Sequence, residues 1–211
     1  IAGLQIVKLN EFSDNAVNPS IYADNDSDKY QGFFIYNWKG GQTGLLVSYI
    51  RNATNKPDFW PATSTYNQKI LAFLPYVKAK IGPVAIEAEA QYHTGKAVEW
   101  EDDAPLIARM GGDIDIESWA AYVNVVADFN KFYFGGTFAY VSGDDPNTKD
   151  ENEGTITGGR DWNPCLIMFN WDRNYWAGAM NGYGGTADVG LMNNAYFGQL
   201  KAGVRPISDL D

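Results

Sequence analysis

Charged and apolar residues alternate over residues 70–93, and this spacing places four charged side chains on one side of an extended chain. They are Lys78, Lys80, Glu87 and Glu89. Alternation with a period of two indicates strands, and Gly82-Pro83 between the two alternating runs indicates a tight turn. With a two-residue turn, Lys78 lies opposite Glu87, and the other side of the hairpin is wholly apolar. The polar side could select solutes by charge, or it could be the solvated side of an ordinary sheet.

Acidic residues gather in two further stretches, and clustered carboxylates can bind calcium. One stretch holds Asp144, Asp145, Asp150, Glu151 and Glu153, and the other holds Glu101, Asp102 and Asp103. Neither has the spacing of a twelve-residue calcium loop, so we interpret both as solvated loops and expect no metal site. At a membrane surface, divalent ions could also bridge such loops to anionic lipid headgroups.

The sequence lacks the residues that nucleophilic or metal-assisted catalysis requires. His93 is the single histidine of the chain, and Cys165 is the single cysteine. No serine motif accompanies His93, which we expect at the polar rim of a strand end. One cysteine excludes an intramolecular disulfide and gives no zinc signature. We therefore expect neither an enzyme activity nor a cofactor.

The segment 161–183 is the most aromatic part of the chain. Its aromatic residues are Trp162, Phe169, Trp171, Tyr175, Trp176 and Tyr183. In one interpretation this loop folds into a pore, where its rings form platforms for sugars. In a second it forms two strands that extend above a membrane, and in a third it is a self-packed surface loop. Periodicity does not distinguish these interpretations.

The elements that position these residues are strands, because period two dominates the whole chain. We expect strands over residues 1–10, 30–39, 43–52, 70–81, 84–93, 116–127, 132–142 and 194–206. About eight strands of roughly ten residues result, a length that crosses a bilayer when the strand is tilted.

The connections between these strands alternate in length along the chain. The short ones are 40–42, 82–83 and 128–131, and the long ones are 11–29, 53–66, 94–115 and 143–193. An up-and-down barrel in an outer membrane shows this alternation, with short turns on one side of the membrane and long loops on the other. A soluble Greek-key sandwich has no reason to keep it.

Acidic residues concentrate in the long connections. The net charge is −10, which argues against nucleic-acid binding. Segments 11–29, 52–66, 94–117 and 143–193 hold 21 of the 26 acidic residues and 7 of the 16 basic ones. The expected strands are therefore mildly basic. No run of about 18 apolar residues occurs, so the sequence predicts no transmembrane helix.

In a barrel, the polar sides of the strands line the lumen. The lining candidates are Lys78, Lys80, Glu87, Glu89, Gln91, Gln199, Lys201 and Arg205. Four cations against two anions predict a mild preference for anions. The aromatic residues near strand ends would form two girdles at the lipid headgroups. These are Tyr30, Trp38, Tyr49, Tyr92, Trp100, Trp119 and Tyr140.

Amphipathic strands flanked by aromatic residues and joined by glycine-rich short turns resemble bacterial outer-membrane porins. The block Tyr140-Val141-Ser142-Gly143-Asp144-Asp145, followed by Asp161-Trp162-Asn163-Pro164, is similar to the alginate-export-like group of these porins. The resemblance implies an all-β, antiparallel, up-and-down transmembrane β-barrel in the outer membrane. It also implies contact with outer-membrane lipid and passive passage of small polar or anionic solutes.

The chain departs from the porin pattern at its ends. Residues 1–10 do not show the pattern of a leader, and the expected strand 194–206 does not end in an aromatic residue. We therefore expect a single barrel domain over residues 1–211 that is incomplete at both ends, with 143–193 as a long extracellular loop. The sequence leaves open whether the protein forms a homo-oligomer. The alternative is a soluble, secreted β-sandwich or barrel that binds carbohydrate through Trp162, Trp171, Tyr175 and Trp176.

Overall fold

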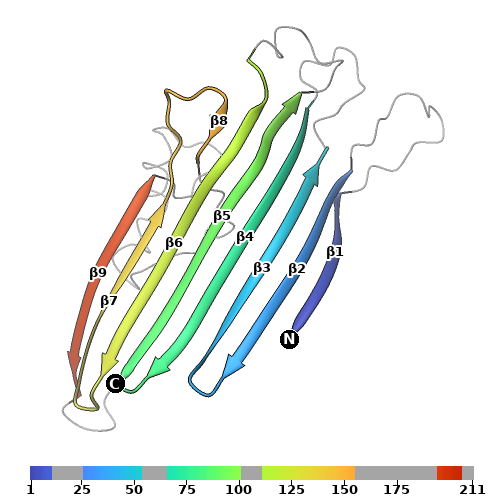
Figure 1. Cartoon of the computed structure of the whole chain (residues 1–211). Coiled ribbons are helices and arrows are strands. Elements are labelled where there is room, and N and C mark those ends of the chain that lie inside the picture. The colour runs from blue at the N-terminus through green and yellow to red at the C-terminus, as the bar shows by residue number, and fades with distance from the viewer. Residues whose placement is uncertain (11–25, 54–65, 101–110, 155–193, 206–211) are drawn as a thin grey trace.

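The computed structural model of the chain describes residues 1–10, 26–53, 66–100, 111–154 and 194–205. These residues form a single sheet of nine strands (Figure 1). Among them, no helix is long and apolar enough to cross a membrane. The all-β class predicted from the period-two alternation is confirmed for this part of the chain.

Eight long strands follow one another across the sheet in chain order. They are β1 (Ala2–Asn10), β2 (Ser27–Trp38), β3 (Gly41–Asn52), β4 (Tyr66–Ile81), β5 (Val84–Trp100), β6 (Ile114–Asp128), β7 (Phe132–Val141) and β9 (Ala195–Val204). Each pairs antiparallel with its neighbours in the order β1-β2-β3-β4-β5-β6-β7-β9. The short β8 (Glu151–Asn152) pairs parallel with β6. The sheet is therefore an up-and-down meander.

The hairpin predicted around Gly82-Pro83 is confirmed. Ile81 pairs with Val84 and Lys78 with Glu87, as a two-residue turn requires. The turn between β2 and β3 is also two residues long rather than the expected three, because Trp38 pairs with Gly41. The turns at this end of the sheet are all short (Figure 1).

Several strands extend further than the sequence predicted. β4 and β5 contain 16 and 17 residues, so β5 continues through the start of the connection expected at 94–115. β8 lies inside the segment expected to be a single long loop. The added residues, 66–69 of β4 and 94–100 of β5, are mostly polar or glycine, so the alternation of apolar and polar residues that indicates a strand is weak there.

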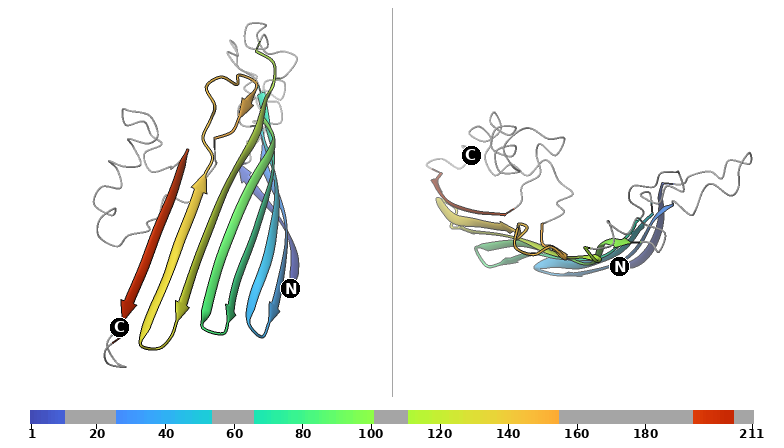
Figure 2. Two further views of the ribbon diagram at one scale, coloured as in Figure 1. Left: turned by 60° about the vertical axis from the view of Figure 1, so that its left-hand side comes forward. Right: turned by 90° about the horizontal axis from the view of Figure 1, so that it is seen from above.

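The described residues do not close into a barrel by themselves. The sheet curves, but β1 and β9 lie at opposite ends of an arc and do not pair (Figure 2). Closure requires hydrogen bonds between the first and last strands, and the described residues make none there. The observed architecture is an open, curved sheet.

The two faces of this sheet differ in polarity and in exposure. Side chains on the concave side of a curved sheet converge, whereas those on the convex side diverge. Ser118 and His93 belong to the more polar face and are 0% and 8% exposed, whereas Phe34 and Trp119, on inner strands of the other face, are 52% and 48% exposed. The more polar face is therefore the concave one, and the apolar face is convex.

Candidate functional site on the concave face

All eight predicted lining residues point to the concave face. Lys78 pairs with Glu87, Lys80 shares its side of β4, and Glu89 and Gln91 follow Glu87 at alternate positions of β5. On β9 the same face carries Gln199 and Lys201, and Arg205 follows at the next alternate position. The strand alternation thus places these side chains on one surface.

A continuous row of polar residues crosses seven strands of this face. Its members, each paired with the next across neighbouring strands, are Asn37, Gln42, Lys78, Glu87, Asn124, Thr137 and Gln199. Asn124 Oδ1 accepts hydrogen bonds from Thr137 Oγ1 at 3.0 Å and from Lys201 Nζ at 2.7 Å. Lys78 and Glu87 approach to 3.8 Å, and their side chains remain 66% and 47% exposed. The row is therefore open to solvent.

Cations dominate the concave face toward the short turns. Lys80 and Lys201 occupy one cross-strand row, separated by Ala85, Val126 and Gly135. Arg205 follows at the end of β9 and donates to Asp128 Oδ1 at 2.9 Å. This excess of positive charge attracts anions, although exposed charges act over only about 8 Å at physiological ionic strength.

A second row contains two tyrosines that are not among the predicted lining residues. It runs through Gly44, Tyr76, Glu89, Tyr122, Ala139 and Phe197. Tyr76 covers Gly44, where a Cβ atom would overlap its ring, and the Tyr76 hydroxyl donates to Gln42 Oε1 at 2.6 Å. The spacing of Tyr76 and Tyr122 could have identified them in the sequence, because both occupy the same alternate strand positions as the polar residues of this face.

The sequence predicted His93 at the rim of a strand end. The structure instead places it in the middle of β5, because that strand continues to Trp100. Its imidazole Nδ1 lies 3.3 Å from Ser118 Oγ. Both side chains are buried, and Ser118 is completely inaccessible to solvent. The pair therefore packs within the face, and its hydroxyl is not available to a substrate.

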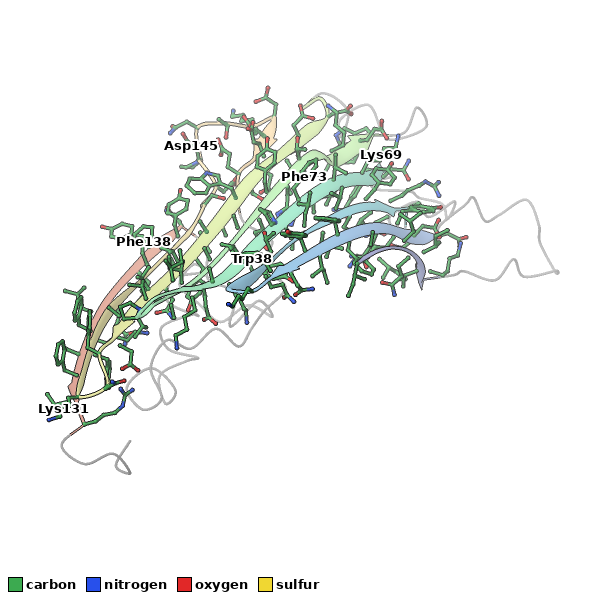
Figure 3. All side chains as sticks on the ribbon, turned by 60° about the horizontal axis from the view of Figure 1, so that its bottom comes forward. Trp38, Lys69, Phe73, Lys131, Phe138 and Asp145 are labelled. Carbon is green, nitrogen blue, oxygen red and sulfur yellow. The ribbon has the colours of Figure 1, made fainter. Side chains whose placement is uncertain are left out.

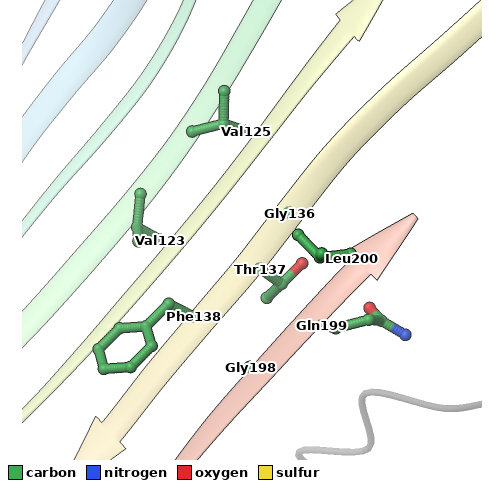
Figure 4. Close-up of a pocket in the computed structure, with 8 residues that line it drawn as sticks. All are labelled: Val123, Val125, Gly136, Thr137, Phe138, Gly198, Gln199 and Leu200. Atoms are coloured by element: carbon green, nitrogen blue, oxygen red, sulfur yellow. The ribbon is translucent and has the colours of Figure 1, made fainter. Parts of the chain in front are cut away.

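The convex face carries a broad band of exposed apolar side chains. Phe34, Leu45, Val125 and Phe134 belong to it, and so do Trp38 and Phe138, which Figure 3 labels. Phe73, also labelled there, is half-buried on the same face. β7 and β9 contribute Gly136 and Gly198, which leave a shallow notch beside Leu200 (Figure 4). A band this large is unusual on a soluble monomer.

Aromatic residues border this band on both sides. Toward the long connections, Tyr30 stacks on Tyr49 at 6.3 Å between ring centroids and Trp119 packs on Tyr140 at 4.3 Å. Toward the short turns, Tyr36 stacks on Trp38 at 6.1 Å. Six of the seven predicted girdle residues lie on this face. Trp100 instead lies beyond the band, edge-on to Tyr66.

Charged residues form a row just beyond the aromatic border on the side of the long connections. The row joins Lys8, Asp28, Arg51, Lys69, Lys96 and Asp115 across neighbouring strands. Lys8 contacts Asp28 at 3.2 Å, Lys69 pairs with Glu99, and Lys96 contacts Asp115 at 2.6 Å. All three acids, Asp28, Glu99 and Asp115, were expected in loops, whereas they lie at the ends of strands.

The acidic stretch at 144–153 binds its own backbone. Asp144 Oδ1 accepts from the Glu153 amide at 3.1 Å, and Glu153 Oε2 accepts from the Asp145 amide at 2.8 Å. Desolvation and the adjacent carboxylate of Glu117 raise the pKa of Glu151 above its usual range. In the described part of the chain, no cluster of His, Cys, Asp and Glu side chains has a geometry that could hold a metal ion.

Other predicted features fall outside the described residues. These are the acidic stretch Glu101, Asp102 and Asp103, the thiol of Cys165 and the aromatic candidates Trp162, Trp171, Tyr175 and Trp176. Comparison with known proteins adds no assignment: no family model, curated protein sequence or solved structure matches the chain.

Proposed function

We propose that this sheet is part of the wall of an outer-membrane β-barrel pore through which small polar or anionic solutes pass passively. The observation that carries the proposal is the convex apolar band with its two aromatic borders. Transmembrane barrels require such a band on the lipid side and a polar surface on the other side of the same strands. The residues of the concave face would line the passage.

The lengths of the strands support the same proposal. The convex positions of β7 between the aromatic borders, from Phe132 to Tyr140, are apolar or glycine. A tilted strand needs about 9–11 residues to cross the hydrocarbon core. In lipid the backbone groups of β1 and β9 would need partners, so the proposal requires these edges to pair with further strands.

Anion preference follows from the charges of the proposed lining. Lys78, Lys80, Lys201 and Arg205 exceed the carboxylates of Glu87 and Glu89 in number. Rings of positive side chains favour anions in pores. The alternative of a soluble carbohydrate-binding protein leaves the exposed convex band without a physical role.

Detergent behaviour tests the membrane assignment. The full-length protein should partition into detergent, and its gel mobility should change on boiling as the barrel unfolds. Reversal potentials in planar bilayers should show anion preference, and Lys78→Glu with Lys80→Glu should shift it toward cations. A monodisperse protein in plain buffer without detergent contradicts the proposal, and a selectivity unaffected by both substitutions contradicts the lining.

A further inference from the structure

We propose that the tip of the β6–β7 hairpin and the convex side of β7 bind one anionic phospholipid. Its phosphate group would contact Lys131, and one acyl chain would follow the strand to the notch between β7 and β9. The inference rests on the proposed function, because it requires the convex side to face lipid. It adds a defined site with a preferred headgroup to a band that otherwise contacts lipid through apolar side chains alone.

Lys131 supplies the cation of the site. It is exposed in the turn between β6 and β7, at the extreme end of the sheet (Figure 3). The neighbouring carboxylate of Asp128 already accepts hydrogen bonds from the Arg205 guanidinium at 2.9 Å and from the Asn130 amide at 3.0 Å. No acidic side chain of the described residues forms an ion pair with Lys131. Its ammonium group can therefore bind a phosphate, to which lysine presents a point charge.

The backbone of the turn is fixed before any lipid binds. The Lys131 amide donates to the Phe129 carbonyl at 2.8 Å, and the Phe129 amide donates to the Phe132 carbonyl at 2.9 Å. The Lys131 carbonyl accepts from the Arg205 amide at 2.7 Å, which ties the turn to the end of β9. Binding therefore orders only the lysine side chain, and this lowers its entropic cost.

Three stacked phenyl rings lead from this turn into the apolar band. Phe129 stacks on Phe132 at 5.1 Å and on Phe134 at 5.8 Å between ring centroids. Each ring is between 42% and 53% exposed. A lysine beside such a surface can extend its ammonium group to the headgroups while its methylene groups stay in apolar surroundings. The cation and the apolar surface are thus adjacent, as a phospholipid requires.

The notch continues this path beyond Phe134. It has a volume of about 410 Å³, and its floor is formed at Gly136 and Gly198 (Figure 4). A Cβ atom at Gly198 would meet no other atom within 4 Å, so the space there is open. Gly136 follows Lys131 by five residues, roughly 16 Å along an extended strand. Half of a hydrocarbon core is about 15 Å thick, so an acyl chain that starts at Lys131 reaches the notch.

The cations at the other end of the strands are already paired. Lys8, Lys69 and Lys96 each contact a carboxylate. An anionic headgroup at Lys131 displaces no such partner. A lipid fits this site better than an acidic protein segment, because the phenyl rings and the notch continue from the cation into the apolar band, where a water-borne peptide leaves them unused.

Native mass spectrometry of the full-length protein in detergent micelles tests the headgroup. Wild-type protein should bind dipalmitoyl-phosphatidylglycerol more tightly than dipalmitoyl-phosphatidylcholine, which carries no net charge. Lys131→Gln should raise the dissociation constant for phosphatidylglycerol about fivefold, the contribution of one lysine near an anionic headgroup. Lys39→Gln is the matched control, since Lys39 is an exposed turn residue beside Trp38, and it should change the constant less than twofold.

A second variant tests the acyl-chain part of the site. Gly198→Leu places a side chain in the open space of the notch. It should weaken binding of dipalmitoyl-phosphatidylglycerol and leave binding of dihexanoyl-phosphatidylglycerol unchanged, because the short chains do not reach the notch. Gel mobility without boiling shows whether each variant is folded.

The outcomes separate the two proposals. Equal wild-type affinity for the two dipalmitoyl lipids, or an unchanged affinity of Lys131→Gln, overturns the lipid site, and currents in planar bilayers would still support the pore. Phosphatidylglycerol binding that depends on Lys131 and Gly198, in a protein that gives no current, supports the lipid site and overturns passage. Poly-glutamate that displaces phosphatidylglycerol from Lys131 at lower concentration overturns lipid as the occupant.

Discussion

Arg205 connects three parts of the sheet at the end with the short turns. Its guanidinium donates to Asp128 of β6 at 2.9 Å and lies over the Tyr133 ring of β7. Its own amide donates to the Lys131 carbonyl at 2.7 Å. A single side chain thus fixes the end of β9 to the β6–β7 hairpin.

Arg205→Gln should lower the free energy of unfolding by about 1 kcal/mol, because it removes a partly exposed ion pair and a cation–π contact. Urea titration of the protein in detergent micelles measures the loss. Arg205→Lys is the control. Its free energy of unfolding should lie between those of Arg205→Gln and the wild type, since an ammonium group lacks the planar face that stacks on Tyr133. Equal stability of all three proteins contradicts this role.

At the scale of the element, two adjacent glycines of β7 have different functions. Gly135 lies on the concave face, where a Cβ atom would overlap the carbonyl oxygen of Val125 on β6. At Gly136, on the convex face, the nearest atoms would be 3.4 Å away. Close approach of β6 and β7 therefore requires glycine at position 135 and not at position 136.

Gly135→Ala should destabilise the protein by about 1–3 kcal/mol, since the backbone of β6 must move to accommodate the methyl group. Gly136→Ala should change stability by less than about 0.5 kcal/mol. Urea midpoints of the two variants in the same micelles give the comparison. A larger loss for Gly136→Ala would show that the register of β6 and β7 differs from the one described.

The pairing of β8 with β6 should depend on pH. Because the pKa of Glu151 is raised, the folded state binds a proton that the unfolded state releases, so the pairing should strengthen as pH falls through this raised pKa. The Asp115 amide, which donates to the Asp150 carbonyl at 2.8 Å, reports on this contact. Its hydrogen-exchange protection factor should rise between pH 7 and mildly acidic pH.

Glu151→Gln should remove this dependence and leave protection high throughout. Asp150→Asn is the control, since it keeps the Glu117–Glu151 pair and should keep most of the pH dependence. A wild-type protection factor that falls with decreasing pH would contradict the assignment.

At the scale of the whole molecule, neighbouring residues of one strand belong to opposite environments. Val125 of β6 lies in the convex apolar band, and Asn124 beside it lies in the concave polar row. If the band faces lipid, the two positions should tolerate a charge very differently, although they are adjacent in the chain.

Val125→Lys should reduce the stability of the full-length protein in lipid vesicles by about 2–4 kcal/mol, the cost of a lysine near the bilayer midplane. Asn124→Lys should have little effect, because its ammonium group remains in water. Folding yield into vesicles, followed by gel mobility without boiling, measures both. Similar yields for the two variants would contradict a lipid-facing convex side.

The sequence by itself determined the eight long strands, their antiparallel order and the face on which most of their side chains lie. Period two does this, since every second residue of a strand points to the same side. The opposition of Lys78 and Glu87 followed from one two-residue turn, and six of the seven predicted girdle residues share one face for the same reason.

Tertiary structure alone decided how residues of different hairpins align. The register between strands joined by long connections is not fixed by local alternation, so the opposition of Glu89 and Tyr122 became visible only when β5 and β6 were paired. The burial of His93 and the open edges at β1 and β9 also depend on pairing and curvature. Curvature arises from the packing of all strands together, and no single segment encodes it.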